Sequence, residues 1–255
     1  MNSPPALQLY SVREELATGR MPVLRRIAAF GYGAVEPYDV RTDPERLREE
    51  LDEAGLAVCS VHANVLGEDA DALLRGTLTA GGSTVIVPWV PPARFADAEG
   101  IAAFADELNE AAARAAGHGL RLGYHNHEFE LASLIGGRTG LEVLADALDP
   151  AVILEVDTYW AAVGGQDVPE LLGRLGDRVR YLHVKDGPVT KEDPMTAVGS
   201  GLMPVAAILA ACPSAEWHVV ELDRCATDML TAVGDSLAWL AEHDLAKPVR
   251  AGTGS

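Results

Sequence analysis

Short β-rich runs alternate with helical patterns along almost the whole chain, and this alternation constrains the fold more than any other feature of the sequence. The β-rich runs cover residues 6–11, 32–37, 56–62, 83–89, 120–127, 151–157, 178–186 and 216–223. Apolar residues at helical spacing occupy residues 22–30, 43–55, 69–78, 99–119, 139–148, 167–176, 203–212 and 229–243. Strands that alternate with helices at short spacing are typical of parallel βαβ units. Eight such units in 255 residues match the size of a (β/α)8 TIM barrel. We therefore predict an α/β fold with one barrel domain over residues 1–246 and a disordered tail over residues 247–255.

A doubly wound open sheet is the competing architecture. Such folds place a glycine-rich phosphate-binding loop after the first strand. Neither G-x-G-x-x-G nor G-x-x-x-x-G-K follows the first β-rich run, which favours the barrel. One irregular insertion, residues 187–201, comes after the seventh run, and we expect it to form a loop over the barrel mouth.

The balance of charge excludes several classes of partner. The chain carries 38 acidic and 20 basic side chains, a formal net charge of −18, and so repels phosphate backbones and anionic lipid surfaces. No apolar run reaches the roughly 18 residues that a transmembrane helix needs. We therefore expect no nucleic-acid or membrane partner, and instead a small-molecule substrate. The sequence leaves open whether the chain forms a homo-oligomer.

The cellular compartment is indicated by the cysteines and by the first residues. Cys59, Cys212 and Cys225 are widely spaced and form no C-x-x-C motif, as is usual for small buried side chains in a reducing compartment. The N-terminal residues lack the basic and apolar regions of a signal peptide. A cytoplasmic protein is expected.

Polar side chains that are costly to bury concentrate at the ends of the predicted strands. They are Glu36, His62, His125, His127, Asp157, His183 and Glu221. In a (β/α)8 barrel the carboxyl ends of the strands form the active-site face. Because side chains alternate between the two faces of a strand, His125 and His127 share the inward face of one strand, and Glu155 and Asp157 that of the next. The inward faces therefore bring carboxylates and imidazoles into one cluster.

Carboxylates and imidazoles together are ligands for divalent ions such as Mn²⁺, Mg²⁺ or Co²⁺, which keep open positions for substrate oxygens. Such an ion polarises a hydroxy-ketone and stabilises the enediolate left after proton removal, while a neighbouring carboxylate acts as general base. Without a cation, Asp157 and Glu221 would repel one another. For Glu155, one layer deeper, we expect an ion pair with Lys185 or Arg180.

Several motifs in this order resemble those of the xylose isomerase-like TIM barrels. The segments are SVHANV, GYHNHEFEL, ILEVDTYWAAVGGQDVPELL, VRYLHVKD, VGSG and HVVELD. That family includes sugar phosphate isomerases and epimerases, ketose 3-epimerases, inosose isomerases and dehydratases, and 3-dehydroshikimate dehydratase. The resemblance extends from LQLYSVRE at the first predicted strand to the eighth strand, nearly the whole chain.

The resemblance implies roles for individual residues. An Asp after strand 6, a His after strand 7 and a Glu after strand 8 hold the metal in this family, and they match Asp157, His183 and Glu221. Glu221 would also be the acid/base carboxylate. The implied substrate-binding residues are Glu36, His62 and Trp160, of which Trp160 stands where the epimerases carry a substrate-contacting histidine. Lys185 is a further substrate-binding candidate from the sequence itself, as a cation for a phosphorylated substrate.

The fifth strand departs from the family pattern. The epimerases place there a glutamate that is the fourth metal ligand and second base, whereas this chain has His125, with His127 behind it and Glu130 just past the strand. Either His125 binds the metal as a neutral imidazole, or Glu130 folds back to supply a carboxylate; strand parity favours His125. We therefore take His125, Asp157, His183 and Glu221 as metal ligands, and Glu221, His127 and Glu130 as candidate catalytic residues.

Three functions follow from this reading. The first is an isomerase or epimerase of a keto-sugar or related polyol that uses one divalent ion (Mn²⁺, Mg²⁺, Co²⁺ or Zn²⁺). Because loss of the second carboxylate suits β-elimination or a one-base proton shuttle, a metal-dependent dehydratase of a keto-sugar or keto-inositol is the alternative. A catalytically inactive sugar-binding barrel is the third. An apurinic endonuclease of the same fold is disfavoured by the charge of −18 and the single ligand set.

Overall fold

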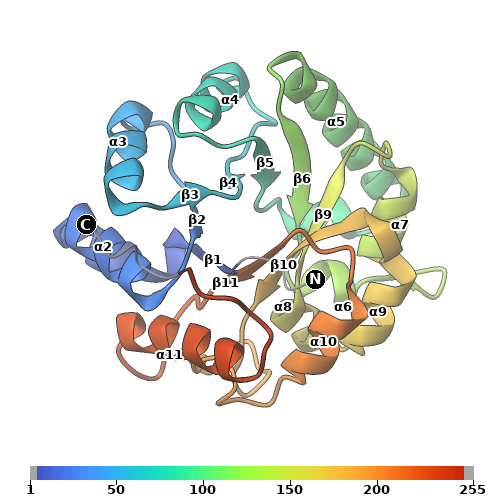
Figure 1. The fold of residues 1–255 in the computed structure, drawn as a ribbon. Coiled ribbons are helices and arrows are strands. Elements are labelled where there is room, and N and C mark those ends of the chain that lie inside the picture. The colour runs from blue at the N-terminus through green and yellow to red at the C-terminus, as the bar shows by residue number, and fades with distance from the viewer. Residues whose placement is uncertain (1–4, 250–255) are drawn as a thin grey trace.

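Parallel strands arranged in a ring, with helices around them, form the architecture of the computed structural model, which describes residues 5–249 (Figure 1). The sheet runs in the order β3-β2-β1-β11-β10-β9-β6-β5-β4. The strands are β1 (Pro5–Gln8), β2 (Ala34–Glu36), β3 (Ala57–Val58), β4 (Val61–His62), β5 (Thr84–Val87), β6 (Arg121–His125), β9 (Ile153–Asp157), β10 (Val179–Val184) and β11 (Trp217–Val220). The predicted (β/α)8 barrel is confirmed.

The third predicted strand is divided into two short strands. Residues 56–62 form β3 and β4, which are separated by Cys59 and Ser60. β3 pairs with β2, whereas β4 pairs with β5 on the other side. The chain between the two halves therefore joins the two ends of the sheet and completes the ring.

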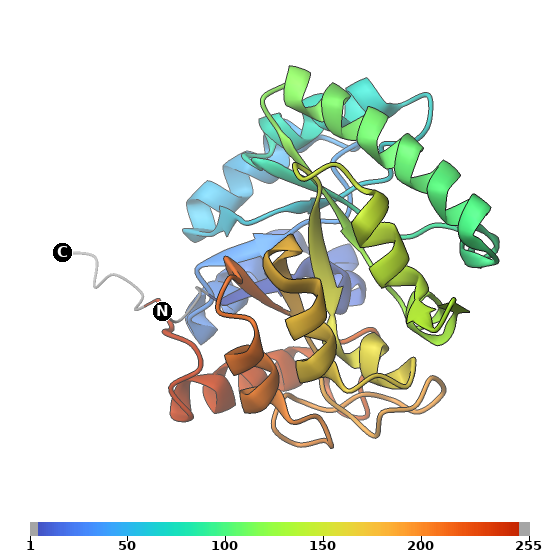
Figure 2. The same ribbon diagram turned by 90° about the vertical axis from the view of Figure 1, so that its right-hand side faces the viewer.

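All eight predicted helices are present. They are α2 (Arg20–Phe30), α3 (Pro44–Ala54), α4 (Ala70–Thr79), α5 (Ala98–Gly117), α7 (Gly140–Ala147), α9 (Val168–Leu175), α10 (Val205–Ala211) and α11 (Met229–Glu242). Aspartates begin four of them by accepting a hydrogen bond from the backbone N–H three residues ahead, namely Asp43, Asp97, Asp167 and Asp228, as expected for N-caps. Figure 2 shows α5, the longest of these helices, running along the outside of the strands.

Several short elements were not predicted. They are the helices α1 (Arg13–Thr18), α6 (Phe129–Ala132) and α8 (Thr158–Val163), the hairpin strands β7 (Leu134–Ile135) and β8 (Arg138–Thr139), and the 3₁₀ turns η1 (Leu9–Val12), η2 (Pro92–Phe95) and η3 (Gly176–Arg178). Each is too short to display a periodic apolar pattern. Two of them, α6 and α8, follow strands that carry predicted site residues.

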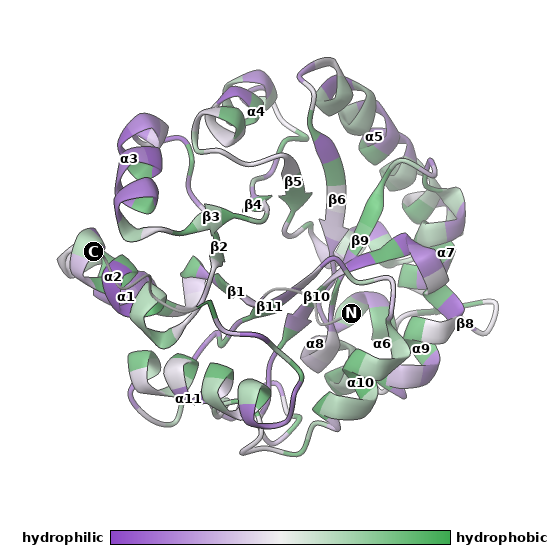
Figure 3. Ribbon diagram, in the orientation of Figure 1, coloured by the Kyte–Doolittle hydropathy of each residue, from purple (hydrophilic) through white to green (hydrophobic). Residues whose placement is uncertain are grey.

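Apolar side chains fill the interior of the barrel below the polar cluster. Ile86, Ile153 and Tyr181 pack together inside the ring. Gly123 on β6 also faces this interior, and a Cβ atom there would lie 2.5 Å from Ile86 Cδ1. A second, larger core lies between the sheet and the helices. Figure 3 shows α3 as largely hydrophilic and α10 as largely hydrophobic.

The insertion after β10 is anchored by one buried carboxylate. Asp186 Oδ1 accepts hydrogen bonds from the backbone N–H groups of Gly187 and Met203, and Oδ2 accepts from Gly199 and Gly201. Among the described residues that line the pocket at the His125–Glu221 end of the barrel, none belongs to residues 187–201. The expected loop over the mouth is therefore a segment fixed at the end of β10.

The C-terminal segment continues beyond α11. The backbone N–H of Val249 donates a hydrogen bond to the Gly31 carbonyl at 2.8 Å, so the first residues of the predicted disordered tail contact α2's C-terminal end. The rest of that tail, residues 250–255, lies outside the described residues. No helix within residues 5–249 has the length and apolar character needed to span a membrane.

Candidate active site and metal centre

The four residues predicted as metal ligands lie in one buried cluster at the carboxyl ends of the strands. His125 and Asp157 end β6 and β9, His183 lies near the end of β10, and Glu221 directly follows β11. None is more than 5% exposed, and one candidate ligand atom from each lies within 4.8 Å of the others. The structure thus brings together the side chains that strand parity selected.

The beginning of α8 sets the orientation of Asp157. Its Oδ1 atom accepts a hydrogen bond from the backbone N–H of Trp160 at 2.8 Å, and the backbone N–H of Asp157 donates to Asn126 Oδ1 at 3.0 Å. The other oxygen, Oδ2, lies 2.8 Å from Lys185 Nζ and 3.8 Å from His125 Nε2. One carboxylate oxygen therefore caps the helix while the other faces the cluster.

Lys185 supplies a buried positive charge beside these carboxylates. Its Nζ atom lies 2.8 Å from Asp157 Oδ2, 2.7 Å from Glu221 Oε2 and 2.9 Å from Asp223 Oδ2. Burial lowers the pKa of Lys185, but the three carboxylates outweigh it and raise that pKa well above its usual value. Lys185 is therefore an ammonium ion, and its partners are these three carboxylates.

The two carboxylates of the cluster differ in how readily they ionise. Burial raises the pKa of Asp157 to about 6, although Lys185 and His183 oppose this rise. Burial also acts to raise the pKa of Glu221, but Lys185 and His183 outweigh it and hold that pKa well below its usual range. Glu221 is therefore ionised at neutral pH and has the charge state that a general base needs.

A second layer of polar side chains lies beneath this cluster. Glu155 Oε2 is 2.6 Å from His62 Nε2, 3.1 Å from His183 Nε2 and 3.2 Å from His125 Nδ1. The expected pairing of Glu155 with Lys185 or Arg180 is therefore wrong. The reason is that Glu155 points into the narrow ring, where it contacts His125 and His183 from β6 and β10, the two strands beside β9. His62 reaches the same carboxylate from β4, which is not paired with β9.

Glu36 belongs to the same deep layer and does not line the pocket. Its carboxylate accepts hydrogen bonds from Gln8 Nε2 at 2.7 Å and from the Ser60 hydroxyl, and it lies 2.8 Å from His183 Nε2. The residue is wholly buried. Its oxygens thus contact protein groups, away from the position predicted for a substrate-binding residue.

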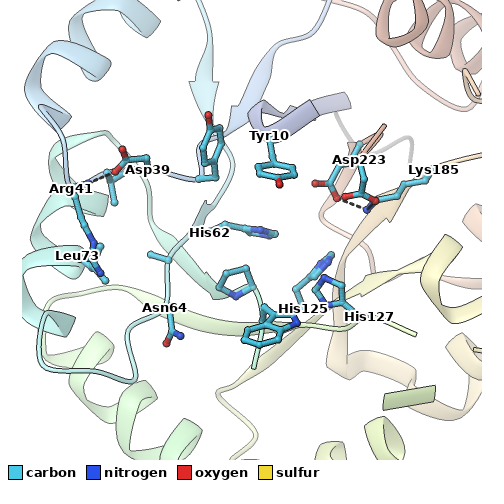
Figure 4. Close-up of a pocket in the computed structure, with 16 residues that line it drawn as sticks. Tyr10, Asp39, Arg41, His62, Asn64, Leu73, His125, His127, Lys185 and Asp223 are labelled. Carbon is cyan, nitrogen blue, oxygen red and sulfur yellow. Dashed lines mark hydrogen bonds and ion pairs between the residues drawn. The ribbon is translucent and has the colours of Figure 1, made fainter. Parts of the chain in front are cut away.

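A pocket of about 480 Å³ opens onto the cluster (Figure 4). His125, His127 and Lys185 lie at one end of it, Arg41 lies at the other, and His62 lies between them. The lining residues are Tyr10, Tyr38, Asp39, Val40, Arg41, His62, Ala63, Asn64, Leu73, Pro88, Trp89, His125, His127, Lys185, Glu221 and Asp223. Polar groups at one end and aromatic walls are typical of a site for a small polar molecule.

His127 and Glu130 occupy different places although both follow β6. His127 lines the pocket, its Nδ1 atom makes no hydrogen bond, and burial lowers its pKa to about 4, so the ring is neutral. Glu130 accepts hydrogen bonds from the Tyr124 hydroxyl at 2.6 Å and from the His127 backbone N–H at 2.9 Å. It is absent from the pocket lining, because Tyr124 belongs to the outward face of β6. The alternative in which Glu130 folds back into the cluster is not supported by this geometry.

Trp160 lies next to the cluster rather than in the pocket lining. Its ring centroid is 5.7 Å from Lys185 Nζ, a distance at which the ring face attracts a cation. Trp160 is half-buried on α8. The residue therefore contacts the predicted site through Lys185.

The sequence did not single out the outer wall of the pocket. Tyr10, Tyr38 and Trp89 line it and are 41%, 39% and 47% exposed. Each stands in the first few residues after β1, β2 or β5. Aromatic residues at the carboxyl ends of the predicted strands were the signal available, since loops at the carboxyl ends of barrel strands build the site.

The donor set fits a divalent cation. Two imidazoles and two carboxylates within 4.8 Å are ligands that Mn²⁺, Co²⁺ and Zn²⁺ accept. The buried Oδ2 atom of Asp157 has the Lys185 ammonium 2.8 Å away, so a cation already faces this oxygen. Lys185 contacts both carboxylates of the set, so ion binding requires the ammonium to move.

Comparisons with known proteins agree with this fold. The family model described as xylose isomerase-like TIM barrel matches residues 24–243. A protein from Geobacillus kaustophilus named inosose dehydratase is 29% identical over 191 residues, which cover 64% of this chain and 61% of that protein. A solved sugar phosphate isomerase/epimerase from Parabacteroides distasonis superposes with a TM-score of 0.80 at 24% identity, over 97% of this chain and 96% of that one. A D-allulose 3-epimerase from Methylomonas sp. superposes with a TM-score of 0.68 at 17% identity, over 94% and 98% of the two chains.

Proposed function

This chain belongs to the xylose isomerase-like TIM barrel family, and we propose that it is a divalent-metal-dependent isomerase or epimerase of a keto-sugar or related polyol. The reaction begins with removal of a proton from the carbon next to the carbonyl. The observation that carries this proposal is the buried set His125, Asp157, His183 and Glu221, of which His125 and Glu221 also line the pocket.

In this proposal His125, Asp157, His183 and Glu221 hold one ion, Mn²⁺, Mg²⁺, Co²⁺ or Zn²⁺. Such an ion polarises a bound carbonyl group and stabilises the negative charge that develops after deprotonation. The arrangement would leave the pocket side of the cluster open for the substrate, since Asp157 and His183 do not line the pocket. A small-molecule carbohydrate is the partner that the pocket and the family support.

Side chains that line the pocket are assigned the proton transfers and the binding of the substrate. Glu221 is ionised and lines the pocket, so we assign it the removal of the proton. Lys185 places an ammonium ion in the same pocket, from which it donates hydrogen bonds to a substrate oxygen. The neutral ring of His127 lies at the same end of the pocket as Lys185, where it can exchange a proton with a hydroxyl group of the substrate.

A dehydratase of a keto-sugar or keto-inositol is the second candidate, and the position of Glu130 favours it. Because Glu130 hydrogen-bonds Tyr124 and the His127 backbone, it lies outside the pocket lining, and Glu221 is the carboxylate of the predicted ligand set that lines the pocket. One base suffices for elimination: it takes the proton next to the carbonyl, and the β-hydroxyl group then leaves as water after protonation. A relative is named inosose dehydratase, which also supports this candidate.

The metal dependence is tested on the purified protein. We expect about one Mn²⁺ per chain by equilibrium binding, and loss of that binding in Asp157→Ala. Asp235→Ala is the matched control because Asp235 is exposed on α11. If the protein binds no divalent ion, or if Asp157→Ala binds it as well as the control, the enzyme proposal fails and the sugar-binding barrel takes its place.

The reaction type is tested with keto-sugars and keto-inositols in D₂O, followed by NMR. An isomerase or epimerase incorporates deuterium into recovered sugar, whereas a dehydratase produces an unsaturated product and water. Both activities should disappear in Glu221→Gln and persist in Glu130→Gln. Exchange without any elimination excludes the dehydratase, and loss of activity in Glu130→Gln alone contradicts the roles assigned here.

We also propose a cytoplasmic location for this reaction. Cys59, Cys212 and Cys225 are all unpaired, as is common in reducing compartments. Retention of three free thiols in protein purified under non-reducing conditions would agree with this location, whereas an intermolecular disulfide would oppose it.

A further inference from the structure

Three imidazole rings meet one carboxylate oxygen deep in the barrel. Glu155 Oε2 lies 2.6 Å from His62 Nε2, 3.1 Å from His183 Nε2 and 3.2 Å from His125 Nδ1. Glu155 and His183 are wholly buried, and His125 is 3% exposed. The contact to His62 is a well-formed hydrogen bond, whereas His125 Nδ1 is near enough for an ion pair but is not aligned as a hydrogen bond.

The charge of Glu155 is balanced by histidine alone. Within residues 5–249, no lysine or arginine forms an ion pair with this carboxylate. A buried carboxylate is costly unless N–H or O–H groups point at it. A ring nitrogen that turned its lone pair toward Glu155 would add repulsion to that cost. The nitrogens facing Glu155 must therefore carry protons.

The opposite nitrogens of the same rings face the outer carboxylates. His183 Nδ1 lies 2.7 Å from Glu221 Oε2, and His125 Nε2 lies 3.8 Å from Asp157 Oδ2. A neutral imidazole has one N–H donor and one lone pair. Fixing the proton of His125 on its deep nitrogen thus leaves the lone pair on Nε2, beside Asp157. His183 Nδ1 makes a hydrogen bond with the Glu221 carboxylate, so in the metal-free protein His183 carries a proton on both nitrogens, and an ion would take the place of the outer proton.

The position of the ring proton decides between two overlapping sets of possible metal ligands. His125 and His183 belong both to the outer set with Asp157 and Glu221 and to a deep set with His62 and Glu155. A neutral ring binds an ion through one nitrogen only, so the position of the proton selects the set. The outer carboxylates have the ammonium of Lys185 as a counter-ion, whereas the deep carboxylate depends on the ring protons.

We propose that Glu155 is a positioning residue that receives the protons of the deep ring nitrogens and thereby aims His125 Nε2 and His183 Nδ1 at the outer site. Glu36 assists at His183, whose Nε2 atom lies 2.8 Å from Glu36 Oε2. This inference rests on the proposed metal-dependent function. Carboxylates that orient metal-binding histidines in this way raise metal affinity, although Glu155 touches neither the ion nor the substrate.

The first test measures Mn²⁺ affinity by the EPR signal of the free ion at one fixed pH. Glu155→Gln keeps the size of the side chain but removes the charge that holds the ring protons. We expect its dissociation constant to rise by roughly 10- to 100-fold, the range known for loss of such partners. Glu110→Gln removes the same charge from an exposed position on α5 and should bind Mn²⁺ as the unchanged protein does. Equal affinities of Glu155→Gln and Glu110→Gln would overturn the proposal.

The second test reads the ring nitrogens of the unchanged protein by ¹⁵N NMR and does not depend on the folding of any variant. In the metal-free protein, we expect the proton of His125 on Nδ1. In the Zn²⁺-loaded protein, we expect the ion on Nε2 of His125 and on Nδ1 of His183. An ion on Nδ1 of His125 and Nε2 of His183 would make Glu155 a ligand of the deep set and refute a positioning role.

The two proposals can fail separately. If the protein binds neither Mn²⁺ nor Zn²⁺, the proposed function fails, and the proton position on His125 in the metal-free protein still decides the inference about Glu155. A proton on Nε2 there contradicts it. If the protein binds the ion and the proton is on Nε2, the proposed function stands and the positioning role is lost.

Discussion

The ammonium of Lys185 and a divalent ion would share the same two carboxylates. Lys185 Nζ lies within 2.9 Å of oxygens from Asp157, Glu221 and Asp223. We predict that Lys185→Met lowers the dissociation constant for Mn²⁺ by about tenfold or more, because the ion no longer has to displace the lysine ammonium. A tenfold change corresponds to only ~1.4 kcal/mol of binding free energy. The dissociation constant is measured by EPR of free Mn²⁺.

The same substitution should destabilise the metal-free protein. Removal of one partner from a buried ion pair costs about 3–5 kcal/mol, which calorimetry in the presence of a chelator would detect as a lower Tm. Lys191→Met is the control, since Lys191 is exposed and pairs only with Glu128 among the described residues. Weaker Mn²⁺ binding in Lys185→Met would mean that the lysine supports the ion rather than competes with it.

Glu130 is a buried acid whose ionisation opposes folding. Burial raises its pKa from 4.5 to about 7, so the folded state holds the proton more tightly than the unfolded state. Stability therefore falls as pH rises from about 4.5 to about 7, by about 3 kcal/mol in total at 1.36 kcal/mol per pKa unit. We predict that Glu130→Gln lacks this fall.

The prediction for Glu130 is checked by urea unfolding of both proteins at pH 5 and pH 8. Asp157, with a pKa near 6, adds a similar slope to both proteins, so the difference between their slopes isolates Glu130. The amide also loses one hydrogen bond from the His127 backbone, which lowers stability equally at both pH values. Parallel pH profiles for the two proteins would contradict the assigned pKa.

At the scale of elements, the length of each helix decided whether the sequence could predict it. Twenty residues of α5 display a complete apolar stripe, whereas α6 and α8 span about one turn and display none. These two short helices nevertheless determine the site. α8 holds one oxygen of Asp157, and the turn into α6 directs Glu130 to Tyr124 and away from the cluster.

The division of the third strand could not be read from the sequence either. The run LAVCSVH contains neither glycine nor proline to mark a break. The structure interrupts it at Cys59 and Ser60, where the Ser60 hydroxyl donates a hydrogen bond to Glu36. The break thus depends on a contact with another strand, which local sequence patterns do not record.

In the segment after β10, four backbone N–H groups donate hydrogen bonds to the carboxylate of Asp186. Asp186→Asn leaves one acceptor oxygen and places an NH₂ group against N–H donors. Hydrogen bonds to charged groups contribute about 1.5–3 kcal/mol each, so we predict a marked local loss of order. Trypsin should then cleave after Lys191 many times faster than in the unchanged protein.

Asp193→Asn is the control for this prediction, because Asp193 lies in the same segment but is exposed. Hydrogen exchange over residues 187–203 provides a second measurement. Unchanged exchange and cleavage in Asp186→Asn would show that the segment is held by other contacts, such as the hydrogen bond from Val198 N–H to Ser236.

At the scale of the whole molecule, the sequence predicted which side chains point inward but not which of them meet. Strand parity placed His125, Asp157 and His183 on the barrel axis, and the cluster contains all three. The contact between Glu155 and His62 was missed because these residues lie on β4 and β9, which are not paired strands. The other two partners, His125 and His183, lie on β6 and β10, the strands beside β9. Contacts across a ring depend on its closure and diameter, which a one-dimensional pattern does not contain.

The net charge of −18 leads to a prediction about salt. At 0.01 M salt the screening length is about 30 Å, comparable to a small domain, and at 0.1 M it is about 10 Å. We predict that NaCl raised from 0.01 to 0.2 M increases the Tm of the metal-free protein by a few degrees, because screening relieves the mutual repulsion of surface carboxylates.

The opposing effect of salt on ion pairs is smaller. Exposed pairs such as Arg25–Glu53, Arg48–Asp52 and Arg138–Asp146 weaken when screened, but each contributes only about 0–1 kcal/mol. Calorimetry in EDTA checks the prediction, and choline chloride in place of NaCl separates screening from binding of Na⁺ at the acidic mouth. An increase in Tm with both salts identifies general repulsion. An increase with NaCl alone would place the effect at a bound cation, and a decrease with both would show that ion pairs dominate the surface.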